Sequence, residues 1–338
     1  MAINRDHSID VLRGLAILLV ILGHSTRVGW LHSYIWSFHM PLFFFISGIL
    51  FNTEKYPEFL PFLKTRLKNI MLPYAFFYLV CFGYWVVVER HMRGGDASVF
   101  NQFLGLFYGT HDSKYNMFNG PLWFLPALFS MEIIYWLVAK LKKWWMILSI
   151  MAVIHIIGMV FCDQLGWLPW GLCHAMVGGL FLCLGNLLNQ YLPLIGKTKK
   201  ITLLASIVLL TGLTFMLLPY TKANLSDLLF TNYYLYAPVA MIGTFAYFNL
   251  SKVIEENRPL EWLGKNTMVL FTLHGQLLRI IYFVLEKVTH TSVDIMRHNI
   301  MYCLVATIMV IAILMPVCYT YNKWINPLLK LSFKKNNS

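Results

Sequence analysis

Apolar runs of membrane-spanning length follow one another along almost the whole sequence. A helix needs about 20 apolar residues to cross the hydrocarbon core of a bilayer, because each residue adds about 1.5 Å. A mean hydropathy of +0.62 and a charged fraction of only 12% exclude an ordinary soluble domain. We therefore predict an all-α, polytopic membrane bundle of about ten transmembrane helices that forms one domain over residues 1–338. The expected helices are 9–25, 35–51, 70–89, 121–139, 144–162, 167–189, 201–219, 231–251, 266–285 and 299–321.

The distribution of basic residues predicts which side of the bundle faces the cytoplasm. Lys and Arg concentrate in the loops on the side of the N-terminus, as in Lys140, Lys142 and Lys143, and are sparser in the opposite loops. Because cytoplasmic loops carry this excess, we expect both termini in the cytoplasm and the protein in the cell (inner) membrane. Attraction to anionic membrane lipids also accounts for the net charge of +12, so no nucleic acid partner is needed.

The first apolar run carries three ionisable residues on one helical face. Asp10, Arg13 and His24 share it, because an eleven-residue step returns to nearly the same side about 16 Å further along. Each ionisable group costs about 2.5–3.5 kcal/mol in hydrocarbon, so this face must contact protein or a wet cavity. Asp10 and Arg13 can neutralise each other as an i,i+3 pair, or Arg13 can bind an anion through its planar fork.

Four further ionisable residues lie at middle or outer depth in the expected helices: His39, His174, His274 and Arg279. Histidine suits general-base chemistry because its ordinary pKa is near 6.5. A membrane histidine more often hydrogen-bonds between helices, which is the simpler role for His174. For His39 and His274 both roles stay open.

Charged residues also occur at or near the cytoplasmic side. Glu132 lies within the fourth expected helix, where a carboxylate needs a partner, most simply Arg or Lys. Lys64, Arg66 and Lys68 precede the third expected helix. This basic group is either ordinary positive-inside charge or, together with Arg13, an attractive site for an anion.

Aromatic and metal-binding residue types give weaker signals. Trp123 and Phe124 open the fourth expected helix, either as part of an aromatic belt or as a stacking surface for a sugar. The six cysteines lie in or beside apolar runs without a C-x-x-C pair, and no H-x-x-x-H spacing occurs, so we predict no metal site. The external stretch 90–120 is long enough for a lid or a passive connection.

Several of these motifs together resemble the membrane acyltransferase-3 family. They are Asp10-x-x-Arg13-Gly14, the Arg13-x10-His24 spacing and the run from Phe38 to Gly48, which contains His39-Met40-Pro41. The run Leu122-Trp123-Phe124-Leu125 is similar to the branch that contains fucose 4-O-acetylase-like enzymes. Gly264-x-x-Thr267 and the later His274 add weaker matches.

The resemblance implies an acyltransferase that moves an acetyl or other acyl group from cytoplasmic acyl-CoA (acetyl-CoA) to a cell-envelope sugar. The acceptor is a hydroxyl of a glycan or polysaccharide precursor, which can be lipid-linked. His24 matches the family's essential histidine, and Arg13 matches the arginine of its R-x10-H pattern. Arg66 and Lys68 match an R-x-R motif in which the second arginine is lysine, so charge is kept but bidentate phosphate binding is lost.

These matches give each candidate residue an expected role. His24 is the general base, on a stripe completed by Asp10 and Arg13, and His39 or Ser47 steadies the oxyanion. The expected ligands of the CoA phosphates are Arg13, Lys64, Arg66 and Lys68. The expected acceptor-binding residues are Trp123, Phe124, Glu132, His174, His274 and Arg279.

Two other classes of protein remain as alternatives. A transporter or flippase for a lipid-linked or anionic sugar also needs a polar core, but it commonly shows inverted repeats and paired broken helices, which we do not find in the sequence. A non-catalytic membrane scaffold leaves the face of Asp10, Arg13 and His24 unexplained.

Overall fold

The protein is a bundle of helices in the computed structural model, which describes residues 6–93, 97–165, 168–195 and 198–331. Its strands β1 (Ala223–Asn224) and β2 (Leu229–Phe230) pair in one short antiparallel hairpin. Nine helices within these ranges are long and apolar enough to cross a membrane. The predicted all-α, multi-pass membrane fold is therefore confirmed, although residue 167, where one expected helix begins, lies outside the described residues.

The expected spans correspond to helices in the same order along the chain. The first two spans are α1 (His7–Ser25) and α2 (Gly29–Ile49). The third span is one continuous run of α3 (Phe59–Arg66), η1 (Leu67–Met71), α4 (Leu72–Tyr84), η2 (Trp85–Glu89) and α5 (Arg90–Arg93). The later spans are η3 (Gly120–Trp123) with α8 (Phe124–Ala139), α9 (Trp144–Leu165), η4 (Pro169–Gly171) with α10 (Leu172–Asn189), α12 (Lys200–Leu217) with η5 (Leu218–Tyr220), α13 (Tyr233–Ile254), α15 (Thr267–Thr289), and α17 (Ile300–Thr320) with η6 (Tyr321–Ile325) and α18 (Asn326–Leu331). The shorter helices are α6 (Val99–Tyr108), α7 (Ser113–Asn116), α11 (Leu192–Ile195), α14 (Arg258–Lys265) and α16 (Val293–Arg297).

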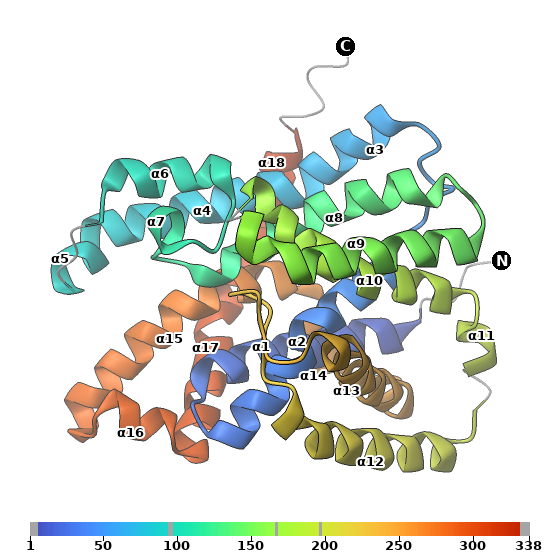
Figure 1. Ribbon diagram of the computed structural model, residues 1–338. Helices are drawn as coiled ribbons and strands as arrows, with labels where there is room; N and C mark the ends of the chain where they lie inside the picture. Colours follow the sequence, from blue (N-terminus) through green and yellow to red (C-terminus); the bar gives the residue numbers. More distant parts are fainter. Residues whose placement is uncertain (1–5, 94–96, 166–167, 196–197, 332–338) are drawn as a thin grey trace.

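The connecting helices gather at two opposite ends of the bundle. In Figure 1, α5 and α16 lie at one end and α11 lies at the other. Because the spanning helices alternate in direction, α5 and α16 belong to the side opposite the start of α1. We refer to this as the outer end and to the other as the inner end, following the predicted orientation.

The helix α2 is long enough to span a membrane but is not one of the nine helices that are both long and apolar enough to do so. It contacts α1, α10 and α13, so protein rather than lipid surrounds it. Its approach to α10 is close, because a Cβ atom on Gly48 would collide with the Leu182 carbonyl and one on Gly185 with the Phe45 carbonyl. Burial in the middle of the bundle explains how this helix tolerates polar residues such as His39.

The helix α1 is held equally closely by α14. A Cβ atom on Gly14 would collide with the carbonyl of Leu260, and one on Gly264 would collide with the carbonyl of Asp10. The two backbones therefore touch directly on the inner half of α1. This contact gives a packing reason for Gly14 beside Arg13 and for Gly264 ahead of α15.

The third span begins earlier than the sequence predicts. The helix starts at Phe59 rather than near residue 70 and runs through the π-helical turns η1 and η2. Arg66 and Lys68 therefore lie within the helix, at and inside η1, instead of ahead of it. Because these residues are charged, the apolar run begins later than the helix does.

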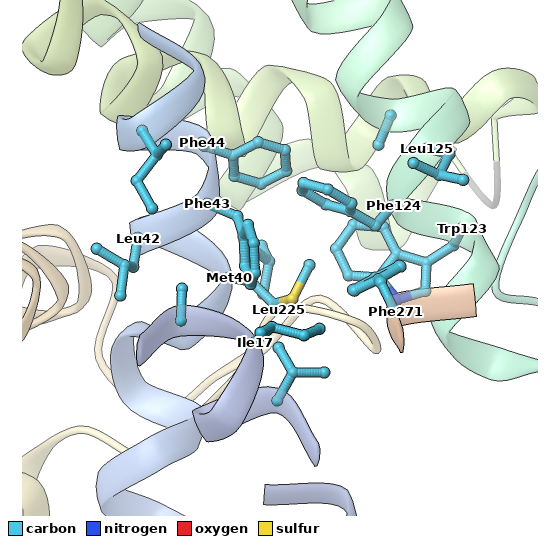
Figure 2. Close-up of a cluster of buried hydrophobic side chains, with 14 of the residues drawn as sticks. Ile17, Met40, Leu42, Phe43, Phe44, Trp123, Phe124, Leu125, Leu225 and Phe271 are labelled. Atoms are coloured by element: carbon cyan, nitrogen blue, oxygen red, sulfur yellow. The ribbon is translucent and has the colours of Figure 1, made fainter. Parts of the chain in front are cut away.

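Aromatic side chains fill the centre of the bundle. The ring of Phe124 lies 5.0 Å from Phe44, 5.9 Å from Phe43 and 5.2 Å from Phe271, and Figure 2 shows these rings together with Trp123. Trp123 and Phe124 are only 3% and 5% exposed. Both residues therefore belong to the core rather than to an exposed aromatic belt.

The outer connections are packed against the bundle. Within the stretch 90–120, the side chain of Gln102 donates to the carbonyls of Ser113 and Lys114, and the hydroxyl of Tyr78 on α4 donates to the carbonyls of Gln102 and Tyr115. Leu225 of the β1–β2 hairpin is also buried. The hairpin and residues 102–115 thus cover part of the outer end of the core.

Candidate active site

The backbone that carries His24 is fixed by an arginine from the far end of the chain. His24 is the penultimate residue of α1, where the last carbonyl groups have no partner within the helix. Arg297 supplies one: its Nη2 donates to the His24 carbonyl at 2.7 Å and its Nε donates to the Ser25 carbonyl at 3.1 Å. A cation is also favourable at the negative end of the helix dipole.

The imidazole of His24 lies against two other rings. Its centroid is 5.0 Å from that of His274 on α15 and 5.4 Å, edge-on, from that of Trp36 on α2. Within the part of the chain that the structure describes, neither ring nitrogen of His24 has a hydrogen bond. The imidazole is thus positioned by its backbone and neighbouring rings, while its nitrogens remain available to a ligand.

A partly open cavity of about 420 Å³ lies beside His24 on the outer side. Helix α15 contributes Arg279, Tyr282 and Glu286 to its wall, and α16 contributes Arg297. The volume falls within the range of small-molecule sites, and the wall mixes two guanidinium groups, a carboxylate and a phenol. A polar molecule could therefore reach His24 from this side.

A second cavity of about 20 Å³ lies on the other side of His24 and has room for about one water molecule. His39, His111 and Trp123 line it, and the hairpin residue Leu225 closes it. His111 lies outside the membrane-spanning helices, with its Nδ1 3.5 Å from Asp227. Burial lowers the pKa of His111, and the nearby carboxylate opposes this effect.

Two further histidines keep one nitrogen as an acceptor. The Nδ1 atom of His274 donates to the Phe271 carbonyl at 2.7 Å, and the Nδ1 atom of His39 donates to the Ile35 carbonyl at 2.9 Å. Because Nδ1 carries the proton in this arrangement, Nε2 keeps its lone pair. Nε2 of His274 is buried and has no hydrogen-bond partner among the described residues. The site therefore brings together the imidazole rings of His24 and His274.

His174 lies further from this centre and makes structural contacts. Its ring stacks on Trp123 at 4.2 Å, and its Nε2 donates to the Ser226 carbonyl at 3.0 Å, which holds the hairpin in place. One face of the Trp123 indole is therefore covered. This arrangement favours a structural role for His174 over a sugar contact, although its hydrogen bond joins α10 to the hairpin rather than to another helix.

Arg279 reaches the outer cavity while paired with a carboxylate. Its Nε lies 2.7 Å from Glu89 Oε1, and its Nη2 lies 3.0 Å from Glu89 Oε2 and donates to the Phe118 carbonyl at 2.5 Å. The pair joins α15 to the third span. Arg279 thus contributes a largely neutralised charge to the cavity wall.

Asp10 and Arg13 lie on the inner half of α1, as the periodicity predicts. Asp10 Oδ1 and Arg13 Nη1 are 4.0 Å apart, and the side chain of Arg13 is 35% exposed. At about 1.5 Å per residue, His24 is about 16 Å further along the helix. The structure thus places the ion pair at one end of the polar face and the imidazole at the other.

Arg66 and Glu132 form a buried ion pair away from His24. Arg66 Nε is 2.8 Å from Glu132 Oε2, and the guanidinium lies over the rings of Phe51 and Phe62 at 5.3 and 5.2 Å. Glu132 is nine residues beyond Trp123 on α8, about 13 Å along the axis. This ion pair favours a structural role for Glu132, as the partner of Arg66, over a role in binding the acceptor.

Ser47 and the lysines of the third span lie towards the inner end. The Ser47 hydroxyl donates to the Phe43 carbonyl at 3.0 Å, and it is about 12 Å from His39 along α2. Lys64 is exposed and Lys68 is half-buried. A separate cavity of about 600 Å³ lies at this end, lined by Lys142 and Trp144 among others. Lys64 and Lys68 therefore lie at the opposite end of the bundle from His24.

Comparison with known proteins decides the family. A family model described as an acyltransferase domain, Acyl_transf_3, matches residues 6–319, which is most of the chain. The chain belongs to the acyltransferase-3 family. The family is the one that the motifs around Arg13 and His24 suggested.

One curated relative is similar to part of this chain. Nodulation protein NolL of Sinorhizobium fredii (strain NBRC 101917 / NGR234) is 30% identical over 156 residues. The match covers 42% of this chain and 39% of NolL, so the chain spans about two fifths of the relative. No solved structure matches the acyltransferase.

Sequence reasoning missed three residues of the candidate site: Glu89, Asn119 and Arg297. Glu89 and Arg279 lie in different expected spans at similar outer depth, which was a signal for their pairing. Arg297 is one of few cations in the outer loops. Asn119 gave no signal. Among the described residues, no group of three or more His, Cys, Asp or Glu side chains is arranged to hold a metal ion.

Proposed function

We propose that this acyltransferase moves an acyl group, acetyl in the simplest case, from acyl-CoA on the cytoplasmic side to a sugar hydroxyl on the outer side. The observation that carries the proposal is the position of His24. Its imidazole has no hydrogen bond within the described residues, borders a polar cavity of about 420 Å³, and lies 5.0 Å from a second histidine. General acid–base groups need this combination of access and fixed geometry.

The reaction can be written as one displacement at the thioester. A ring nitrogen of His24 accepts the proton of the sugar hydroxyl while its oxygen attacks the thioester carbonyl carbon. The C–O bond forms, the C–S bond breaks, and the thiolate leaves as CoA after taking the proton from the His24 imidazolium. The lone pair on Nε2 of His274 can accept a hydrogen bond from that imidazolium, and His39 is the remaining candidate for steadying the oxyanion.

The donor is proposed to enter from the inner end. CoA carries several phosphate charges, and Lys64 and Lys68 supply cations there. Arg13 is paired with Asp10 but its side chain is 35% exposed, whereas the paired Arg66 is only 18% exposed. The distance of about 16 Å along α1 suits an extended pantetheine arm between the phosphates and His24. Metal chemistry plays no part in this proposal.

The acceptor is proposed to enter through the outer cavity. A sugar of a cell-envelope glycan, free or lipid-linked, meets hydrogen-bonding groups there from Tyr282, Glu286 and Arg297. Trp123 and Phe124 shape the core behind the site rather than offer an open stacking face. The excess of inner cations supports insertion in the cell (inner) membrane with this cavity facing outwards.

The test is transfer of radiolabel by the purified protein. Wild type with labelled acetyl-CoA is expected to place acetyl on members of a panel of cell-envelope glycans, and His24→Ala is expected to lose at least about 100-fold in rate. The matched control is His298→Ala, at an exposed outer histidine. A folded His24→Ala protein that transfers acetyl at the wild-type rate would exclude His24 as the base.

A liposome assay separates this function from transport. The enzyme acetylates the glycan, whereas a transporter or flippase carries it across the membrane unmodified. Translocation without acetylation, with no transfer to any glycan in the panel, would contradict the proposed reaction. Mass analysis of the quenched protein distinguishes direct transfer from an acyl group covalently held by His24.

A further inference from the structure

The segment ahead of η3 is pinned to one face of α15. Asn119 Nδ2 donates to the Thr272 carbonyl at 2.9 Å, and Arg279 Nη2 and Gln276 Nε2 both donate to the Phe118 carbonyl, at 2.5 and 3.4 Å. Thr272, Gln276 and Arg279 share that face because they are spaced by four and three residues. The segment therefore has a fixed position against the helix that borders the outer cavity.

Two buried acceptors in this contact have no donor among the described residues. Asn119 Oδ1 and Gln276 Oε1 are buried and have no hydrogen-bond partner in the described ranges, and Asn119 as a whole is only 1% exposed. Buried polar atoms in folded proteins almost always have a partner, which can be a water or a ligand. The amide nitrogen of Asn119 already donates hydrogen bonds to the Thr272 carbonyl and to the sulfur of Cys81. A partner for Oδ1 must therefore be a donor.

The place where such a donor would enter is marked by a glycine. Gly275 and Pro121 both line the cavity beside His24. A Cβ atom built on Gly275 has Asn119 Oδ1 as its nearest neighbour, at 3.9 Å, followed by the ring of Pro121 at 4.0 Å. The carboxamide oxygen thus lies directly behind a stretch of cavity wall that carries no side chain.

We infer that Asn119, with Gln276 beside it, forms a hydroxyl-recognition subsite of the acceptor cavity for a neutral sugar or similar polyol. A carboxylate or phosphate oxygen does not fit there, because it would face carbonyl oxygens without a proton to share. Arg279 does not supply an anion site at this wall, since Glu89 and the Phe118 carbonyl already engage its guanidinium. The inference rests on the proposed function and names the part of the cavity that recognises a second hydroxyl of the acceptor.

The decisive variant is Gly275→Ala. Its methyl group would stand at ordinary van der Waals distance from Asn119 Oδ1, so it fills the subsite without a collision, and alanine is a better helix former than glycine. The matched control is Gly212→Ala on α12, where a Cβ atom meets no other group within 4 Å. Gln276→Met keeps the side-chain length while removing the second acceptor.

The expected result is a selective effect on the acceptor. With labelled acetyl-CoA and methyl glucoside or the best glycan of the panel, Gly275→Ala should raise the KM for the sugar at least tenfold and the KM for acetyl-CoA less than twofold. A series of monodeoxy sugars identifies the recognised hydroxyl: its removal should weaken binding to wild type and leave Gly275→Ala unaffected. The Gly212→Ala protein should behave as wild type.

Two outcomes would overturn the subsite, and they differ from failure of the proposed function. An unchanged sugar KM in a folded Gly275→Ala protein would contradict the inference, as would equal losses for every deoxy sugar in wild type and variant. If wild type transfers acetyl to no sugar, the proposed function fails by itself. In that case thermal stabilisation of wild type by the sugar alone, lost in Gly275→Ala, still supports the subsite, and its absence excludes it.

Discussion

The imidazole rings of His24 on α1 and His274 on α15 lie 5.0 Å apart and are tilted by 54°. Nδ1 of His274 is held by the Phe271 carbonyl, so the ring presents a lone pair on Nε2. We expect His274→Gln to lower kcat by about 100-fold, because the amide oxygen of glutamine is a much weaker base than the imidazole nitrogen that faces the imidazolium formed on His24. Single-turnover rates with saturating acetyl-CoA measure this effect. A folded His274→Gln protein with wild-type kcat would restrict His274 to packing.

Arg297 is expected to act through the position of His24. Replacement by methionine removes both hydrogen bonds to the end of α1 and should lower kcat about 10- to 100-fold, since small displacements of a catalytic group have large effects. The control is Arg27→Ala, because Arg27 pairs with Asp294 at the exposed surface, where such pairs contribute about 0–1 kcal/mol. Equal kcat values for the two variants would show that the cap does not position His24.

The ion pair of Arg66 and Glu132 should behave as a unit. Glu132→Gln or Arg66→Met alone leaves one buried charge unpaired and should cost about 3–5 kcal/mol of unfolding free energy. The double variant is expected to be more stable than the sum of the two losses predicts. Thermal unfolding in detergent measures all three proteins, and strictly additive losses would show that the two charges do not interact.

Binding of acetyl-CoA should depend more on Lys68 than on Lys142, which lines the cavity at the inner end. We expect Lys68→Gln to raise the KM for acetyl-CoA about five- to tenfold, because one charge contact to phosphate is lost while the sugar site is untouched. Lys142→Gln is the matched control at the inner cavity of about 600 Å³. A larger rise for Lys142→Gln would place the CoA phosphates in that cavity instead.

Acidification should destabilise the outer end through His111. Its pKa is lowered by burial, so between the folded value and the ordinary value of 6.5 the unfolded chain binds more protons than the folded protein. Stability therefore falls as pH drops below about 6.5. His111→Gln should have a smaller fall in melting temperature between pH 7.5 and 5.5 than wild type.

The neighbouring carboxylate provides a check on the sign of that effect. Asp227 lies 3.5 Å from His111 and raises the pKa that burial lowers. Asp227→Asn should therefore lower the pKa of His111 further and steepen the loss of stability on acidification. A shallower loss of stability on acidification in Asp227→Asn would show that the carboxylate does not raise the pKa of His111.

The helices and the polar face of α1 were predictable because they depend on local properties. Span length follows from bilayer thickness, and the common side of Asp10, Arg13 and His24 follows from helical periodicity. The start of the third span at Phe59 was missed because charged residues continue the helix beyond its apolar part. Composition alone does not reveal a helix that extends beyond the hydrocarbon core.

The contacts between helices were not predictable from one sequence. The meeting of His24 with His274, and of Arg66 with Glu132, depends on how α1, α8 and α15 pack. Apolar residues surround each of these helices, so periodicity does not say which neighbour a polar side chain faces. Asn119 illustrates the same limit, because an asparagine before a helix is ordinary until its amide oxygen is found buried without a donor.

The cap that Arg297 places on α1 has a consequence for biosynthesis. The helix α1, which contains His24, is translated before α16, whose Arg297 fixes the last turn of α1. A nascent chain that ends after α15 would contain His24 but would lack the hydrogen bonds from Arg297 to the last turn of α1. Acyl transfer should therefore begin only after the segment that contains Arg297 has been translated and has packed against α1.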